Sequence, residues 1–194
     1  AIELRNLTGN PVNVGGWFLS DAKGSLRKYR IPDGTVIPVG SYAVFYEYQF
    51  NLDPLNNPLA FALSSAKGDE VYLSSTDSGG ALTGYRASVK FGAAENGVSF
   101  GRYLNSVNDE HFVAMSARTF GVDDPATTNQ FRTGTGLPNV YPKVGPLVIS
   151  EIMYHPPDIV AGGTTNDNVR DEFIELHNIT TAPVDLYDRA FPTN

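Results

Sequence analysis

The stretch 2–45, IELRNLTGNPVNVGGWFLSDAKGSLRKYRIPDGTVIPVGSYAVF, decides the fold of this chain. It begins with alternating apolar and polar residues and ends with a short apolar and aromatic run, and both patterns are typical of β-strands. Between them lie two Pro-x-Gly triplets, Pro32-Asp33-Gly34 and Pro38-Val39-Gly40. Proline fixes φ at the second position of a β-turn and glycine suits the fourth. We therefore expect short strands joined by tight turns.

Similar strand signals follow along most of the chain, separated by Gly-rich or polar turns. They fall at GWFLSD, LAFALSS, DEVYLSS, YRASVKFG, VSFGRYL, EHFVAMS and LVISEIMY. We find no sustained 3.6-residue periodicity, so no helix longer than one or two turns is expected. Many short strands predict an all-β sandwich or barrel. Its predicted core contains Trp17, Tyr42, Val44, Phe61, Tyr72 and Phe100.

The composition limits the classes of partner. The chain has 194 residues, 41% of them hydrophobic, which is enough to bury a core. A formal net charge of −7 disfavours binding to nucleic acid. No apolar stretch is long enough to span a bilayer, so we expect no membrane insertion. The absence of cysteine excludes disulfides, zinc thiolate sites and cysteine nucleophiles.

The ordered motifs of the opening stretch resemble the lamin tail domain, a small immunoglobulin-like β-sandwich. The later segment GDEVYLSS is similar to the part of that family that precedes its last strands. The resemblance implies a bacterial, secreted multidomain protein with tandem copies, located outside the cell or on its surface. The residues that match the family pattern are Ile2, Glu3, Leu4, Asn6, Pro11, Val12, Gly16, Trp17, Leu19, Asp21, Ile31, Pro32, Gly34, Thr35, Ile37, Pro38, Gly40 and Tyr42.

The opening phrase returns near the other end of the chain. With an offset of 172 (174 − 2), seven of the thirteen residue pairs from 2–14 and 174–186 are identical. The resemblance implies a lamin-tail-like sandwich at 1–120 that lacks its first strand, a Pro/Gly/Thr-rich linker at 121–145, and the first strands of a second copy at 146–194. Because residue 1 is not Met and no signal peptide is present, we expect a piece of a longer polypeptide.

A sandwich without one strand exposes unpaired backbone groups and an apolar groove. The segment 147–154 is of the missing type, so we predict that it fills this groove. It either folds back within its own chain or enters the next molecule, and a head-to-tail donation of that kind builds a fibre. The predicted partner is therefore the chain itself, with a strand-pairing interface made by Ile2, Leu4, Leu147, Val148, Ile149, Ile152, Tyr154, Phe173, Ile174 and Leu176.

Few residues suggest chemistry. The three histidines, His111, His155 and His177, sit in no recognisable motif, and neighbouring carboxylates on a strand point to opposite faces. We therefore predict no catalytic residues, no cofactor and no enzymatic activity. We predict no metal site and interpret the segment TTNDNVRDE first as an ordinary Asn/Asp turn. The alternative is a calcium-binding loop without EF-hand spacing. Its oxygen ligands would come from Asn166, Asp167, Asn168 and Asp171.

Two functions from different classes compete. The first is a non-catalytic structural module that interacts with its own copies. The second is a carbohydrate- or calcium-dependent binding module that serves an extracellular enzyme, with Tyr46, Tyr48 and Phe50 as an exposed platform for a polysaccharide. Asn6 and Asn178 fit the N-glycosylation sequon, but we interpret them first as turn residues.

Glu3 and Glu175 lie inside equivalent strands of the repeat. We interpret both as structural, each an inward carboxylate bonded to backbone at a sheet edge.

Overall fold

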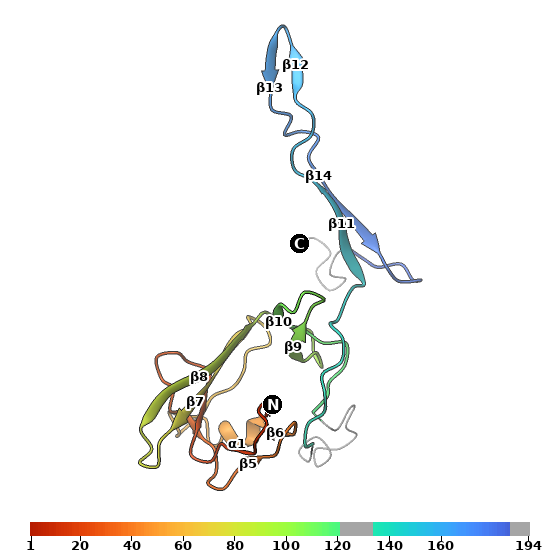
Figure 1. Cartoon of the computed structure of the whole chain (residues 1–194). Helices are drawn as coiled ribbons and strands as arrows, with labels where there is room; N and C mark the ends of the chain where they lie inside the picture. The colour runs from red at the N-terminus through yellow and green to blue at the C-terminus, as the bar shows by residue number, and fades with distance from the viewer. Residues whose placement is uncertain (121–133, 187–194) are drawn as a thin grey trace. The chain divides into compact units, whose positions relative to one another are not determined.

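The computed structural model describes residues 1–120 and 134–186, which fall into two compact units, Ala1–Lys143 and Val144–Asn194. Figure 1 shows the course of the chain, and each unit is described by itself. Fourteen strands and one four-residue helix are present in the described part of the chain. This confirms the prediction of an all-β fold. No helix in these residues is long and apolar enough to cross a membrane.

The first unit is an immunoglobulin-like β-sandwich. One side of its core carries two antiparallel strand pairs, β1–β6 and β2–β5, and the other carries the four-stranded sheet β4-β3-β7-β8. The bounds of these elements are β1 (Ile2–Arg5), β2 (Val12–Asn13), β3 (Phe18–Ser20), β4 (Tyr29–Arg30), β5 (Val36–Ile37), β6 (Tyr42–Phe45), α1 (Glu47–Phe50), β7 (Asp69–Thr76) and β8 (Leu82–Phe91).

The two Pro-x-Gly triplets form the turns that the sequence predicts. The N–H of Thr35 donates to the carbonyl of Pro32, and the N–H of Ser41 donates to the carbonyl of Pro38. Gly34 has φ +77°, which only glycine adopts without strain. These turns fix where β5 begins and ends, and so bring β6 back beside β1.

The core lies between the two layers. Leu19 and Ile31 are completely buried, and Phe61 and Tyr72 of the predicted core are buried as well. Trp17 and Phe100 are only half-buried, although Trp17 packs against the core. Two further predictions were wrong, because strand residues alternate between faces. Ala43 and Phe45 of β6 contact the core, whereas Tyr42 and Val44 lie on the other face.

One predicted strand does not form. The segment LAFALSS buries Phe61 against the core but pairs with no strand. Its alternation of large and small apolar residues indicates that some of them are buried, and burial does not require a hydrogen-bonded ladder.

The first unit also contains a hairpin and a hydrogen-bonded return segment. The hairpin is made by β9 (Phe100–Leu104) and β10 (Glu110–Ala114). The N–H groups of Gly136 and Leu137 then donate to the carbonyls of Phe120 and Thr119, and the N–H of Lys143 donates to the carbonyl of Ala114. These bonds place 134–143 in the first unit, so the boundary between the units follows Lys143 and lies later than the predicted end of the domain near residue 120.

The second unit consists of two hairpin ladders in series (Figure 1). β11 (Leu147–Met153) pairs with β14 (Phe173–Asn178), and β12 (Ile159–Ala161) pairs with β13 (Thr164–Asn166). Ile149 and Glu151 face consecutive residues of β14, so Ser150 is the extra residue of a β-bulge.

Most large apolar side chains of the second unit are solvent-exposed in this structure. Two-stranded ladders without a covered apolar face are marginally stable in water. We infer that this unit needs further contacts.

Candidate functional site

A large groove runs along β1 in the first unit. Its cavity volume is about 1320 Å³. In the described residues β1 pairs with β6 on one side and has no strand on its other edge. We call this cavity the β1 groove. Its apolar lining includes Leu4, Leu63, Val71, Leu73, Val89, Phe91, Phe100 and Phe112. An apolar groove beside an unpaired strand edge is a suitable site for an added β-strand.

Glu3 lies in β1, on the face turned away from the core. One of its carboxylate oxygens, Oε2, is buried and has no hydrogen-bond partner among the described residues. Burial raises the pKa of the Glu3 carboxyl to about 7, while the N–H of Leu137 and the charge of Arg5 act in the opposite direction. A Cβ at Gly136 would lie 2.6 Å from Oε2, so the return segment presses closely on this carboxylate. The expected contact with backbone is limited to the effect of the Leu137 N–H on this pKa, and one oxygen stays unsatisfied. The expected inward direction is wrong, because Ile2 and Leu4 are the residues of β1 that pack against the core.

The predicted strand-pairing residues fall into two groups. Ile2 and Leu4 lie in β1. Seven others lie in the second unit and take part in the ladder between β11 and β14. The pairs are Leu147 with Asn178, Val148 with His177, Ile149 with Leu176, Ile152 with Ile174, and Met153 with Phe173.

Tyr154 follows the end of β11 and is 80% exposed. The two groups thus belong to different units, and pairing of β11 with β1 stays a prediction.

The repeated phrase forms the same turn twice. The N–H and hydroxyl of Thr8 both donate to Oδ1 of Asn6, at 2.9 and 2.8 Å, and the Asn6 amide donates to the carbonyl of Asn10 at 2.8 Å. At the same offset of 172, Thr180 makes both bonds to Asn178 at 2.9 and 2.8 Å, and the Asn178 amide donates to the carbonyl of Ala182 at 2.8 Å. The interpretation of both asparagines as turn residues agrees with these bonds.

Comparison with known proteins identifies the first part of the chain. Residues 1–90 match the family model of the Lamin Tail Domain. This segment is a lamin tail domain. Such domains are non-catalytic, immunoglobulin-like modules. No curated protein and no solved structure matches the chain.

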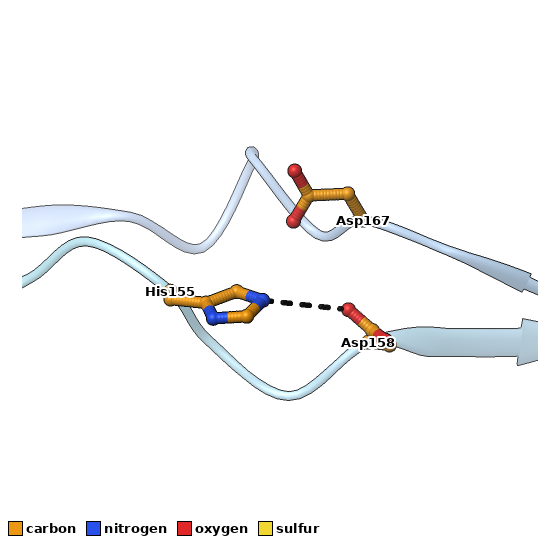
Figure 2. Close-up of side chains that lie close together, drawn as sticks. All are labelled: His155, Asp158 and Asp167. Carbon is orange, nitrogen blue, oxygen red and sulfur yellow. Dashed lines mark ion pairs between the residues drawn. The ribbon is translucent and has the colours of Figure 1, made fainter.

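Outside the lamin tail domain, one cluster in the second unit could hold a metal ion. His155, Asp158 and Asp167 place one imidazole nitrogen and two carboxylate oxygens within 4.8 Å of one another. Figure 2 shows His155 directed toward Asp158, with 3.8 Å between Nε2 and Oδ1, and Asp167 on the opposite arm of the hairpin. All three residues are exposed. One imidazole with two carboxylates suits zinc better than calcium, which prefers oxygen ligands alone.

The calcium candidates named from the sequence have different surroundings. The amide of Asn168 donates to Asp171 at 2.6 Å, whereas Asp167 joins the histidine cluster and Asn166 lies within β13. Sequence reasoning missed His155 and Asp158 as neighbours of Asp167. The available signal was the Gly-Gly pair between β12 and β13, which predicts a two-residue hairpin loop and hence a register that brings its two ends together.

The predicted aromatic platform does not form. Tyr46 and Phe50 of the lamin tail domain are each 3% exposed, and Tyr48 is 45% exposed. The reason is that α1 turns Phe50 into the core, where its ring stacks on Phe61 at a centroid distance of 4.6 Å. The remaining histidines of the sequence analysis, His111 and His177, lie exposed on β10 and β14.

Proposed function

We propose that this chain is a non-catalytic structural module of a secreted bacterial multidomain protein, and that it associates head-to-tail with copies of itself by β-strand complementation. In this association β11 of one molecule occupies the β1 groove of the next. A heterologous contact of this kind extends into a fibre when it does not close on itself. The observation that carries the proposal is the β1 groove, an apolar cavity beside a strand edge that lacks a partner strand in the described residues.

The second unit supplies a strand of matching character. Ile149 and Ile152 are 60% and 55% exposed, and both lie opposite apolar residues of β14. They share one face of β11 although they are three residues apart, because the bulge at Ser150 shifts the alternation by one residue. In a strand placed along β1 this face would point into the groove.

The energetic gain can be estimated from these exposures. Complete burial of an isoleucine side chain contributes roughly 1.5–3 kcal/mol. Because Ile149 and Ile152 are already partly covered, we expect roughly 2–3 kcal/mol from the two together, or a roughly 30- to 150-fold effect on affinity.

The tether between the units is short. Only Val144, Gly145 and Pro146 separate the hydrogen-bonded Lys143 from β11. Four Cα steps span at most about 14 Å. Insertion of β11 into the groove of its own molecule would require Lys143 to lie within this distance of the far end of β1. A second molecule carries no such restriction.

The test measures the assembly of the purified 194-residue chain. Native mass spectrometry and electron microscopy are expected to show concentration-dependent oligomers. The double variant Ile149→Asp/Ile152→Asp should remain monomeric, whereas Val160→Asp, a matched change at a 72% exposed site in β12, should assemble normally.

A synthetic peptide with the sequence of 146–156 should cap growing oligomers, and a scrambled peptide should not. A chain that stays monomeric at all concentrations refutes the proposal. So does assembly that the double variant and the peptide leave unchanged.

A cation-dependent binding module is a second candidate, favoured by the cluster of His155, Asp158 and Asp167. If it is correct, zinc or calcium ions raise the thermal midpoint of the chain, and Asp167→Asn abolishes the effect. Asp171→Asn is the control, because Asp171 lies outside the cluster. An unchanged midpoint with both ions excludes this candidate.

A further inference from the structure

Glu175 of the second unit occupies the place that Glu3 has in the first. The offset of 172 that aligns the asparagine turns also aligns β14 with β1, so that Ile174, Glu175 and Leu176 correspond to Ile2, Glu3 and Leu4. The two glutamates nevertheless have different neighbours, because β14 pairs with β11 whereas β1 pairs with β6 among the described residues.

The strand β11 provides Glu175 with a hydroxyl donor. The side chain of Ser150, the bulge residue of β11, donates to the Glu175 carboxylate at 2.5 Å and lies 3.3 Å from the Glu175 carbonyl oxygen. The carboxylate of Glu3 has no equivalent contact, and its Oε2 is buried without a partner. A buried acceptor without a donor is costly, so a strand that brings a donor is favoured here once the return segment at Gly136 moves aside.

We propose that Ser150 of a second copy donates its hydroxyl to the Glu3 carboxylate and thereby fixes the register in which β11 pairs with β1. This inference rests on the strand complementation proposed above. The pairing between β11 and β14 serves as the template for it. In the resulting register, Ile149 lies opposite Leu4, Glu151 opposite Glu3, and Ile152 opposite Ile2.

The exchange replaces one pairing by an equivalent one. To reach Glu3 in this way, β11 must leave its own β14, so the bond between Ser150 and Glu175 is lost as the bond to Glu3 forms. Exchanges of identical elements between molecules cost little for this reason. The net gain comes from the isoleucines that enter the β1 groove and from the buried carboxylate that acquires a donor.

Because Glu3 and Glu175 compete for the Ser150 hydroxyl, the same substitution at the two glutamates should have opposite effects on assembly. Glu3→Ala removes the acceptor in the groove and should weaken assembly roughly tenfold. Glu175→Ala removes the acceptor that holds β11 in its own unit and should strengthen assembly roughly three- to tenfold. Once Glu3 is alanine, Ser150→Ala should strengthen assembly as Glu175→Ala does, because it then removes only the bond to Glu175. Ser150→Thr, which keeps the hydroxyl, should behave like the native chain.

Cross-linking tests the register without relying on the folding of these variants. The chain has no cysteine, so single cysteines report single contacts. Val148 pairs with His177, the equivalent of Arg5 (177 − 172). A mixture of Arg5→Cys and Val148→Cys chains should therefore form an intermolecular disulfide on mild oxidation. A mixture of Arg5→Cys and Tyr154→Cys chains should form none.

The outcomes separate the two proposals. Absence of assembly refutes strand complementation and this inference with it. Assembly in which both glutamate variants shift the affinity in the same direction, or in which the cross-link forms at Tyr154, refutes the inference alone.

Discussion

The Asn6 side chain binds the turn after β1 to the end of β5, and its removal should destabilise the first unit. Asn6 is 4% exposed. Besides the local bonds of its turn, its amide donates to the carbonyls of Ile37 at 2.9 Å and Pro38 at 3.2 Å, which lie 31 and 32 residues further along the chain. Asn6→Ala removes these long-range bonds together with the local ones.

The expected loss follows from the number and burial of these bonds. A typical hydrogen bond contributes about 0.5–1.5 kcal/mol net, and a buried group left without a partner costs about 1–3 kcal/mol. Because the bond to Ile37 is buried and the others are partly buried, we expect Asn6→Ala to lower the free energy of unfolding by about 2–4 kcal/mol.

Asn57→Ala is the matched control. Asn57 is an exposed turn asparagine whose amide donates to the carbonyl of Leu52 and whose oxygen accepts from the N–H of Leu59, and all of these bonds are local. Its loss should cost about 1 kcal/mol or less.

Urea unfolding followed by the fluorescence of Trp17 measures both variants. Trp17 is the only tryptophan of the chain and lies in the first unit, so the signal reports this unit alone. Equal losses for Asn6→Ala and Asn57→Ala would refute the reasoning, because the long-range bonds would then contribute nothing.

Three further changes test the core and the surroundings of β1. Glu3→Gln should alter the pH dependence of stability. The pKa of Glu3 rises from 4.5 to about 7 on folding, so the native carboxyl contributes stability below about pH 4.5 and loses it as the pH rises to about 7. After allowance for solvent screening, the variant should be more stable by roughly 1–2 kcal/mol at pH 8 in urea titrations, and an unchanged pH profile would contradict this. Leu19→Ala should cost about 2–5 kcal/mol, because Leu19 is fully buried, whereas Leu55→Ala at a 94% exposed site should cost under about 0.5 kcal/mol in the same titration. Gly136→Ala should lower the thermal midpoint, since Gly136 has φ +91° and a methyl group there would lie 2.4 Å from the nearest carbon. Gly24→Ala, with no atom within 4 Å of the added carbon, should not lower it, and equal midpoints for the two variants would argue against a packed return segment.

Features with a local cause were predictable from the sequence. The turns at Gly34 and Gly40 follow from proline and glycine chemistry, and the asparagine turns follow from side chains that bond their own backbone. The strands β7 and β11 were predicted from short runs of apolar and polar residues that are typical of strands. The family resemblance, which rests on an ordered series of such signals, was confirmed over residues 1–90.

Features that depend on distant backbone contacts were not predictable. The segment 134–143 has little apolar content and was interpreted as part of a linker, yet it joins the first unit through N–H and carbonyl groups that every residue type carries. The prediction of an exposed aromatic platform was wrong for a related reason. Whether Phe50 points outward depends on the turn of α1 against the core, and the identity of the residue does not reveal this.

The bulge at Ser150 determines how β11 can change in length. Deleting a residue within a strand normally turns every following side chain to the opposite face. Here Ile149 and Glu151 already pair with neighbouring residues of β14, so loss of Ser150 would leave an uninterrupted ladder with both isoleucines on their original face. Loss of Val148 would instead reverse one end of the strand relative to the other. Position 150 is therefore where this strand can lose a residue and keep the same two faces, although the loss would remove the hydroxyl that donates to Glu175.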